Sequence, residues 1–391
     1  MMERINKTNT KTNICSVVVW GTDNSNALGL IRQLQSVGFE ILFIINKKPG
    51  FCVVKSSFCP KYIIVPDLEG GYNYLLEHAA DFPTKPALIS TSDVIAEMID
   101  QHKEILSRYY VVMGTKESGL LTKILDKNYM CDMAKECGFR VPASVAWRTS
   151  DPIPEIDYPC LVKPNKKSVI RPKPFKTKKC DNKESLVNLL GSVPQGCEFI
   201  IQDFVPKESD LLIYGCRLLD GTIIMPGALI KERWSIYGDG SYGQILKSAP
   251  KGFDSKPIKS FLERISYYGL FSFEFGLYKN EYYFYEVNLR NDGTSHYFFQ
   301  AGVNLPAAWV LSSYGMSYDK ELGVIERDYY FMDEVFDRLN VKSGVVSKRE
   351  WKKQYKESSI FVYYQKSDPK PYYYMRVKAF AKSIQMKIRK A

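Results

Sequence analysis

The chain has 391 residues, a length that predicts two or three packed domains rather than one small core. Its hydrophobic content of 45% and charged content of 25% are ordinary for a soluble globular protein. The formal net charge of +11 favours anionic partners, and leaves nucleotides, nucleic acid, anionic lipid and acidic substrates all open.

The cysteines and histidines argue against a zinc protein. Nine cysteines are scattered without a C-x-x-C pair, and three histidines form no Cys/His cluster, so a reducing compartment fits best. No apolar run approaches the roughly 18 to 20 residues that span a bilayer. Residues 1–13 are polar and resemble a disordered lead rather than a signal peptide. We therefore expect a cytoplasmic protein.

The first part of the chain predicts a small α/β domain. An apolar run at 14–20 is followed by a turn at Gly21, a helical pattern at 27–37 and a second strand at 40–45. This order is a βαβ unit and implies a parallel sheet. The turn lacks the G-x-G-x-x-G spacing, so we expect a Rossmann-like domain that positions substrate without binding NAD. Further strands are expected at residues 62–65, 87–90 and 110–113.

The next segment predicts one helix, followed by a strand and a basic stretch. The helix covers 117–137, and periodicity alone places Lys127 on its solvated face. The run at 160–164 is a strand that carries Lys163 near its end. Seven Lys or Arg residues then lie within the segment 165–179. This basic segment is either a solvated linker or a loop that closes over phosphates. A helix at 183–190 and a strand at 198–202 follow.

Two further strands are predicted around a turn at Asp220-Gly221. They cover residues 211–219 and 222–230, and Asp-Gly is a strong hairpin signal. Lys231-Glu232-Arg233 lies at the end of the second strand. A glycine-rich loop at 237–243 is expected to give backbone flexibility near these charges.

Residues 271–290, FSFEFGLYKNEYYFYEVNLR, predict a β-hairpin. Two runs rich in Phe, Tyr and Val flank a three-residue polar loop at 279–281, in which Asn280 can take the left-handed conformation. The expected register pairs Tyr278 with Tyr282. Because side chains alternate along a strand, this register decides which polar residues share a face.

One face of this hairpin carries the polar residues of a candidate cation site. The register puts Glu274 directly opposite Glu286, with Asn288 and Arg290 further along the same face. Opposed carboxylates about 5 Å apart repel unless one is protonated, an Arg or Lys lies between them, or a divalent cation is bound. Mg²⁺ prefers such oxygen ligands and completes its shell with substrate phosphates. The alternative is that the hairpin has another register and that these polar residues simply lie on a solvated strand face.

The order of short motifs along residues 14–315 resembles the ATP-grasp superfamily of carboxylate ligases. The motifs are D-K on a helix, L-V-K-P on a strand, I-Q-D-F-V-P, K-E-R, F-E-F and E-V-N-L-R. The pattern is similar to biotin carboxylase, carbamoyl-phosphate synthase and the D-aspartate ligase-like carboxylate-amine ligases. The most specific feature is F-E-F followed, twelve residues on, by E-x-N-x-R.

The resemblance implies a fold and a division of the chain. The expected fold class is α/β with α+β elements: a Rossmann-like N-terminal domain followed by a two-lobed ATP-grasp domain. The implied boundaries are residues 14–116, 117–315 with a small lobe at about 145–205, and a C-terminal extension at 316–391.

The resemblance also implies roles for particular residues. ATP and Mg²⁺ are the expected cofactors, with Mn²⁺ as an alternative metal. The phosphate-covering loop of many relatives is rich in Gly and Ser, whereas residues 165–179 contain Ser168 and no glycine, which leaves that assignment open. The implied metal ligands are Glu274, Glu286 and Asn288; the implied nucleotide contacts are Lys127, Lys163, Gln202, Asp203, Phe204, Val205 and either Glu208 or Asp210; and the implied catalytic residues are Arg290, Lys231 and Arg233.

The implied activity is an ATP-dependent carboxylate-amine ligation that forms an amide through an acyl phosphate. The partners would be a small carboxylate and an amine, such as an amino acid or a cell-envelope or saccharide precursor. Two other classes stay open: a catalytically silent ATP-binding regulator or scaffold, and a nucleic-acid-binding protein suggested by charge alone. Intact acidic residues argue against the first, and the lack of a nucleic-acid-binding motif argues against the second.

The C-terminal segment 375–391 predicts a basic amphipathic helix. Its apolar residues near one face are Val377, Phe380, Ala381, Ile384 and Ile388. Such a helix packs on its own domain or lies on an anionic membrane, so a peripheral contact at the inner membrane face is one interpretation. A homodimer is also compatible with the sequence.

Overall fold

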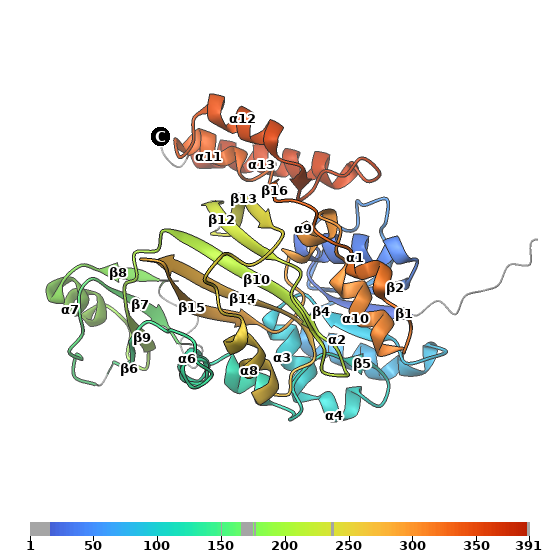
Figure 1. Cartoon of the computed structure of the whole chain (residues 1–391), viewed down its shortest axis with the longest axis horizontal. Helices are drawn as coiled ribbons and strands as arrows, with labels where there is room; N and C mark the ends of the chain where they lie inside the picture. The colour runs from blue at the N-terminus through green and yellow to red at the C-terminus, as the bar shows by residue number, and fades with distance from the viewer. Residues whose placement is uncertain (1–15, 150, 166–174, 176, 236–237, 389–391) are drawn as a thin grey trace, which may run out of the picture.

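The computed structural model describes residues 16–149, 151–165, 175, 177–235 and 238–388. Most of the basic stretch at 165–179 and the start of the expected glycine-rich loop at 237 lie outside these residues. Three sheets make up the described chain: one parallel, one large and mainly antiparallel, and one small (Figure 1). The mixed α/β class predicted from the sequence is confirmed.

The N-terminal sheet is parallel, as predicted, in the order β3-β2-β1-β4-β5. Val17 and Val19 pack in the core that contains α1, whereas Val18 and Trp20 pack in the core that contains α2 and α3. Because both faces of β1 are covered, its sequence is a continuous apolar run. The elements are β1 Ser16–Gly21, α1 Ser25–Val37, β2 Glu40–Asn46, β3 Lys61–Val65, α2 Leu68–Glu77, η1 Ala79–Asp81, β4 Ala87–Ser90, α3 Asp93–Gln101, α4 Lys103–Leu106 and β5 Val111–Val112.

The helix predicted at 117–137 is two helices, α5 Leu120–Ile124 and α6 Lys127–Glu136. Asp126 interrupts it with extended backbone and caps α6 by accepting hydrogen bonds from the amides of Asn128 and Tyr129. A capping side chain at this position offers the backbone an alternative to a continuous helix. Lys127 therefore occupies the first turn of α6 rather than the middle of a longer helix.

The small sheet lies at one end of the molecule, in the order β6-β9-β7-β8 (Figure 1). Its strands pair antiparallel, and one core of aromatic and aliphatic side chains lies between the sheet and α7. The elements are β6 Ser144–Arg148, β7 Cys160–Pro164, β8 Lys178–Cys180, α7 Lys183–Gly191 and β9 Glu198–Asp203.

The large sheet runs in the order β15-β14-β10-β12-β13-β16-β17, with β11 paired to β10. The strand predicted at 222–230 is divided because Pro226 and Gly227 lie between β11 and β12, and proline cannot donate to a strand ladder. The predicted glycine-rich loop is also partly strand, since β13 begins at Gly240. The elements are β10 Ser209–Arg217, β11 Ile223–Ile224, β12 Ala228–Trp234, β13 Gly240–Leu246, α8 Lys256–Arg264, β14 Gly269–Tyr278, β15 Glu281–Asn288, α9 Ser295–Gln300 and α10 Leu305–Ser313.

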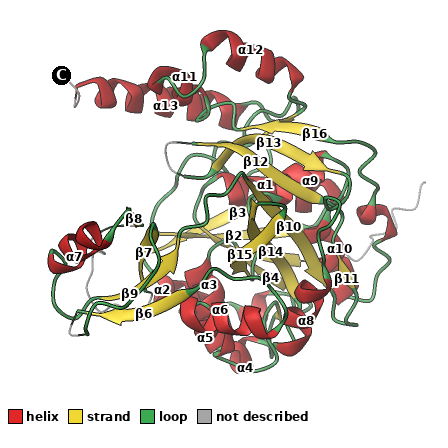
Figure 2. Ribbon diagram, turned by 60° about the vertical axis from the view of Figure 1, so that its left-hand side comes forward, coloured by secondary structure: helices red, strands yellow, loops and turns green. Residues whose placement is uncertain are grey.

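The segment predicted as an extension from residue 316 contributes to the large sheet and to the main core. Met375 and Ala379 pack in the same core as α1 and β1, and Arg32 of α1 forms a buried ion pair with Asp368 (2.9 Å). Helices α11 to α13 lie over the β13 and β16 side of the sheet (Figure 2). The elements are η2 Asp319–Leu322, β16 Tyr329–Met332, α11 Arg338–Ser343, α12 Lys348–Glu357, β17 Ile360–Phe361 and α13 Lys370–Ile388.

Helix α13 buries a different face from the one predicted. Met375 and Ala379 are buried, whereas Val377 is 70% exposed and Phe380 is 64% exposed. Side chains beyond residue 381, including those predicted at 384 and 388, lie outside the described part. Among the helices described, none combines the length and apolar character needed to cross a bilayer.

Candidate functional site

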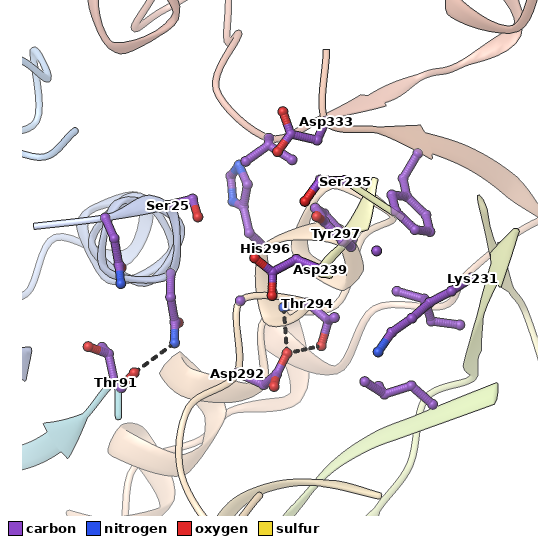
Figure 3. A pocket seen from close by; sticks show the side chains of 18 of the residues that line it. Ser25, Thr91, Lys231, Ser235, Asp239, Asp292, Thr294, His296, Tyr297 and Asp333 are labelled. Atoms are coloured by element: carbon purple, nitrogen blue, oxygen red, sulfur yellow. Dashed lines mark hydrogen bonds between the residues drawn. The ribbon is translucent and has the colours of Figure 1, made fainter. Parts of the chain in front are cut away.

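A cavity of about 490 Å³ lies where the carboxyl ends of β1 and β4 meet the large sheet (Figure 3). β1 and β4 are adjacent, and the chain leaves β1 toward β2 on the other side. In open α/β sheets this change of direction creates a crevice at the strand ends, where ligands bind. The large sheet supplies the opposite wall, through Leu212, Leu229, Lys231 and Glu274.

The hairpin places its two glutamates as predicted, by a different register. The loop has two residues, Lys279 and Asn280, both with positive φ (50° and 62°), so Tyr278 pairs with Glu281. A bulge then shifts the register by one between Glu274 and Phe275. The predicted three-residue loop and the Tyr278–Tyr282 pair are therefore wrong.

The bulge restores the opposition of Glu274 and Glu286. Tyr285 is the extra residue of the bulge, and its ring lies against Gly276, where an added Cβ would meet Tyr285 Cε2 at 2.4 Å. A bulge bends the strand and re-aims side chains, which is why such features recur beside functional sites.

Lys231 partly neutralises this carboxylate pair. Its Nζ lies 2.8 Å from Glu274 Oε2, while Glu286 is exposed at the cavity. Burial raises the pKa of Glu274, and the positive charge of Lys231 lowers it. The negative charge of Glu286 raises it further, so the pKa of Glu274 remains above its usual value. One lysine therefore faces two carboxylates, and a further cation would stabilise the pair.

The carboxylate pair fits a magnesium ion that is shared with phosphate. In the described part of the chain, no three His, Cys, Asp or Glu side chains group closely enough to hold a metal alone. Proteins commonly hold Mg²⁺ with one or two carboxylates, and substrate phosphates supply further ligands. Glu274 and Glu286 are two such carboxylates.

Asn288 does not line the cavity, and its amide is engaged elsewhere. Its Oδ1 accepts a hydrogen bond from Arg290 (3.0 Å), and its Nδ2 donates to Ser272 (3.2 Å). The structure thus places this predicted metal ligand behind Arg290, where its amide orients the guanidinium rather than offering an open oxygen.

Arg290 lines the cavity and joins the two sheets. Its guanidinium lies 2.7 Å from Asp93 at the start of α3 and 3.6 Å from Asp292. Although burial opposes it, these carboxylates raise the pKa of Arg290, so the side chain stays charged. Asp292 is itself held by the backbone amide and hydroxyl of Thr294, at 2.9 and 2.8 Å.

Arg233, which the resemblance implied as a catalytic residue, is not among the residues that line the cavity. Its guanidinium makes two hydrogen bonds to Asp337, at 2.8 and 2.7 Å. The same carboxylate accepts hydrogen bonds from Ser241 and Trp351. A bulge between Lys231 and Arg233 directs the two basic side chains to different surroundings.

Lys163 of the small lobe is within electrostatic reach of Lys127, the first residue of α6. Lys163 Nζ donates to Gln202 Oε1 (2.7 Å). Burial and the neighbouring charge of Lys127 lower the pKa of Lys163 to about 8, while Glu286 opposes this shift. Two lysines within electrostatic reach of each other favour an anion, and Glu286 acts on Lys163 from the carboxylate pair.

The predicted hinge, residues 202–205, connects the small lobe to the large sheet. The Asp203 amide donates to the Ala143 carbonyl (2.9 Å), and the Phe204 amide donates to the Pro159 carbonyl (3.1 Å). The Val205 carbonyl accepts from the Lys207 amide (2.8 Å). These bonds fix the path of the strand between the lobes.

The two acids proposed for ribose occupy different places. Glu208 accepts a hydrogen bond from the Lys279 amide (3.1 Å), at the turn of the hairpin. Asp210 is buried, pairs with Lys207, and lies opposite Lys231 in the neighbouring strand. Asp210 therefore faces the same side of the sheet as Lys231, and Glu208 holds the hairpin turn.

Several cavity residues were missed from sequence. Asn26 donates to the carbonyls of Thr91 (3.0 Å) and Asn291 (3.1 Å), which joins the ends of β1 and β4 to the large sheet. Asp93 and His296 also line the cavity. The available signal was positional, because polar residues directly after β1 and β4 lie at the ligand-binding edge of a parallel sheet.

Comparison with known proteins identifies the fold. No family model matches the chain. The D-aspartate ligase of Enterococcus faecium (strain Aus0004) is 24% identical over 250 residues, which cover 59% of this chain and 59% of the ligase. The chain thus matches less than two thirds of that relative's length.

Solved structures match over a larger share of the chain. The L-amino acid ligase of Bacillus licheniformis has a TM-score of 0.62 at 15% identity, covering 82% of this chain and 80% of that one. The N5-carboxyaminoimidazole synthetase of Staphylococcus aureus, complexed with ADP, has a TM-score of 0.63 at 14% identity, covering 87% of both. The chain therefore has the fold of the ATP-grasp superfamily of carboxylate-amine ligases, as its motifs predicted.

Proposed function

We propose that this protein is an ATP- and Mg²⁺-dependent carboxylate-amine ligase. The observation that carries the proposal is the pair Glu274–Glu286, opposed at a cavity that Lys231 and Arg290 also line. The names of the D-aspartate ligase and the L-amino acid ligase among the similar proteins favour an amino acid as one substrate. Phosphoryl transfer to a carboxylate and displacement of phosphate by an amine then form an amide.

The small lobe would bind the nucleotide. Lys163 and Lys127 are adjacent cations suited to phosphate oxygens, and the strand at 202–205 offers backbone groups for adenine. Of the two candidate acids, we assign the ribose hydroxyls to Asp210, because it is buried on the Lys231 side of the sheet. An ionised carboxylate accepts strong hydrogen bonds from hydroxyls.

The large sheet would hold the reacting groups. Glu274 and Glu286 would hold Mg²⁺, which offsets phosphate charge during phosphoryl transfer when bound. Lys231 is positioned by Glu274 to contact a phosphate or substrate oxygen. Arg290, fixed by Asp93 and Asp292, would stabilise negative charge on the acyl phosphate.

The test is Glu286→Gln, assayed by carboxylate-dependent ADP release across a panel of carboxylates and amines. We expect turnover to fall by roughly 10²- to 10³-fold, the size typical for loss of one preorganised electrostatic group. Binding of Mn²⁺ in the presence of ADP should weaken, and the circular dichroism spectrum should not change. Turnover equal to wild type would reject the assignment, and nucleotide binding without ADP release from any pair would favour the scaffold alternative. Peripheral membrane contact through α13 and a homodimer stay predictions.

A further inference from the structure

The cavity holds more negative charge than the proposed nucleotide chemistry uses. Among the described residues that line it, six carry carboxylates and two are basic: Asp93, Asp239, Glu274, Glu286, Asp292 and Asp333 against Lys231 and Arg290. Lys231 pairs with Glu274, and Arg290 pairs with both Asp93 and Asp292. A metal ion would account for Glu286, and within the described part of the chain neither Asp239 nor Asp333 forms an ion pair.

These two acids flank strands other than the two that carry the glutamate pair. Asp239 directly precedes β13, and Asp333 directly follows β16. β14, which carries Glu274, and β16 are four strand positions apart, roughly 19 Å at the usual strand spacing. Figure 3 shows Asp239 and Asp333 among the side chains around the cavity, with Lys231 on another part of its wall. Asp333 therefore lies on a wall of the cavity away from the glutamate pair, and Asp239 lies nearer to Lys231, whose side chain packs against the neighbouring Gly240.

Asp333 is held so that part of its carboxylate remains available. Its Oδ1 accepts hydrogen bonds from the amides of Val335 (3.2 Å) and Phe336 (2.8 Å). Oδ2 has no protein partner among the described residues. Burial and the nearby carboxylates of Glu334 and Asp337 raise the pKa of Asp333 to about 8. Without a cation the carboxyl is therefore largely protonated near neutral pH, and a bound cation would favour its ionised form.

His296 is an independent sign that a ligand belongs at this end. It is 3% exposed, lines the cavity, and neither ring nitrogen has a partner among the described residues. Burial and the charge of Arg32 lower the pKa of His296 to about 3, so the imidazole is neutral and presents one donor and one acceptor. A buried polar group without a partner is costly, and a ligand hydrogen-bonding to it would remove that cost.

We infer that the end of the cavity formed by Asp239, Asp333 and His296 binds the amine substrate, and that this substrate carries a second positive charge besides its reacting nitrogen. The inference rests on the proposed function. The carboxylate substrate is disfavoured at this end because Asp239 would repel it and because it could not stabilise an ionised Asp333. The reacting nitrogen must lose its proton to attack the acyl phosphate, so it cannot supply lasting charge to two carboxylates. A diamine or a basic amino acid meets both conditions.

Binding measurements with matched pairs of probes test this inference. L-lysine is compared with L-norleucine, and 1,4-diaminobutane with n-butylamine, by calorimetry on the full chain with ADP and Mg²⁺. We expect the dissociation constant of each dicationic probe to be at least about tenfold lower than that of its partner. Equal affinities within both pairs would overturn the inference.

Variants locate the effect. Asp333→Asn, which keeps the oxygen that accepts from Val335 and Phe336, should reduce the preference to less than about threefold. Asp239→Asn changes an exposed side chain and should reduce it in the same direction, so the test stands even if Asp333→Asn folds poorly. Asp328→Asn, an exposed acid at the other end of β16, should keep the full preference. A full preference in both Asp333→Asn and Asp239→Asn would overturn the inference.

A separate measurement examines the underlying function. Hydroxylamine is a small, largely neutral nucleophile at pH 7.5 that needs no cation subsite, and wild-type protein with ATP, Mg²⁺ and carboxylates should convert it to hydroxamates. Absence of hydroxamate from every carboxylate would count against the ligase function. It would leave the binding preference for dications to be judged by calorimetry alone.

Discussion

Arg290 and Arg233 lie at the ends of two strands of the same sheet, and both were expected at the active site from sequence. Their surroundings differ in what the partner carboxylates do. Asp337, the partner of Arg233, is fully buried and also binds Ser241 and Trp351. Asp93 and Asp292, the partners of Arg290, line the cavity. A basic residue near a site is therefore available to a ligand only when its partners also face that site.

The comparison also separates two kinds of contribution. Arg233 joins β12 to the segment that begins α11, because Asp337 directly precedes that helix. Its hydrogen bonds hold the C-terminal helices on the sheet. Arg290 joins the parallel sheet to the hairpin and still faces open space, so its charge can act on a bound group.

The largest expected effect is on stability, in Arg233→Ala. Removing one partner of a buried ion pair leaves Asp337 charged and uncompensated, which costs about 3–5 kcal/mol in the free energy of unfolding. Urea denaturation followed by circular dichroism measures this loss. Arg264→Ala is the control, because its pair with Glu136 is exposed and should contribute no more than about 1 kcal/mol. If Arg233→Ala kept its stability but lost ADP release, Arg233 would have a catalytic role rather than a structural one.

The next largest effect is on turnover, in Arg290→Ala. We expect carboxylate-dependent ADP release to fall by roughly 10²- to 10³-fold, with a smaller change in ATP affinity, because the guanidinium would act on charge that develops in the reaction. Arg140→Ala is the control, since it removes an exposed pair with Glu281 on the same hairpin. An effect confined to ATP binding would argue against the placement of Arg290 at the intermediate.

The smallest effect concerns the pH dependence of nucleotide binding. Lys163 has a pKa of about 8, so it is charged below that pH and neutral above it. The KM for ATP should therefore rise as pH increases from 7 to 9. Lys127→Ala removes a charge that lowers this pKa, and the rise should move to higher pH.

Lys123→Ala, which alters an exposed lysine of α5, is the control for that measurement and should leave the midpoint of the rise unchanged. If Lys127→Ala shifts the midpoint to lower pH or leaves it in place, the two lysines do not share one phosphate-binding region. This result would extend the comparison of the arginines, because proximity to the site would again not mean participation in it.

Local patterns predicted much of this architecture. The apolar runs of β1, β2 and β4 marked a parallel sheet because strands covered on both faces need apolar side chains throughout. The predicted helix at 117–137 was wrong because the cap at Asp126 depends on one side chain's hydrogen bonds and leaves the apolar periodicity unchanged. The face by which α13 packs on the core could not be predicted from its own apolar pattern, because its packing partners lie in α1 and β1, more than 300 residues earlier.

The sequence by itself determined that Glu274 and Glu286 lie on the paired strands of one hairpin, because a short turn joins the two runs. Their direct opposition depends on a bulge at Tyr285, which side-chain alternation alone does not predict. A two-residue turn followed by a bulge replaced the expected three-residue loop, with the same pair as the outcome. The tertiary structure alone decided which charges join that pair. Arg290 meets Asp93 across 197 positions of sequence, and Asp333 and His296 reach the same cavity from separate elements. Such contacts depend on how whole sheets pack, and no local spacing encodes them.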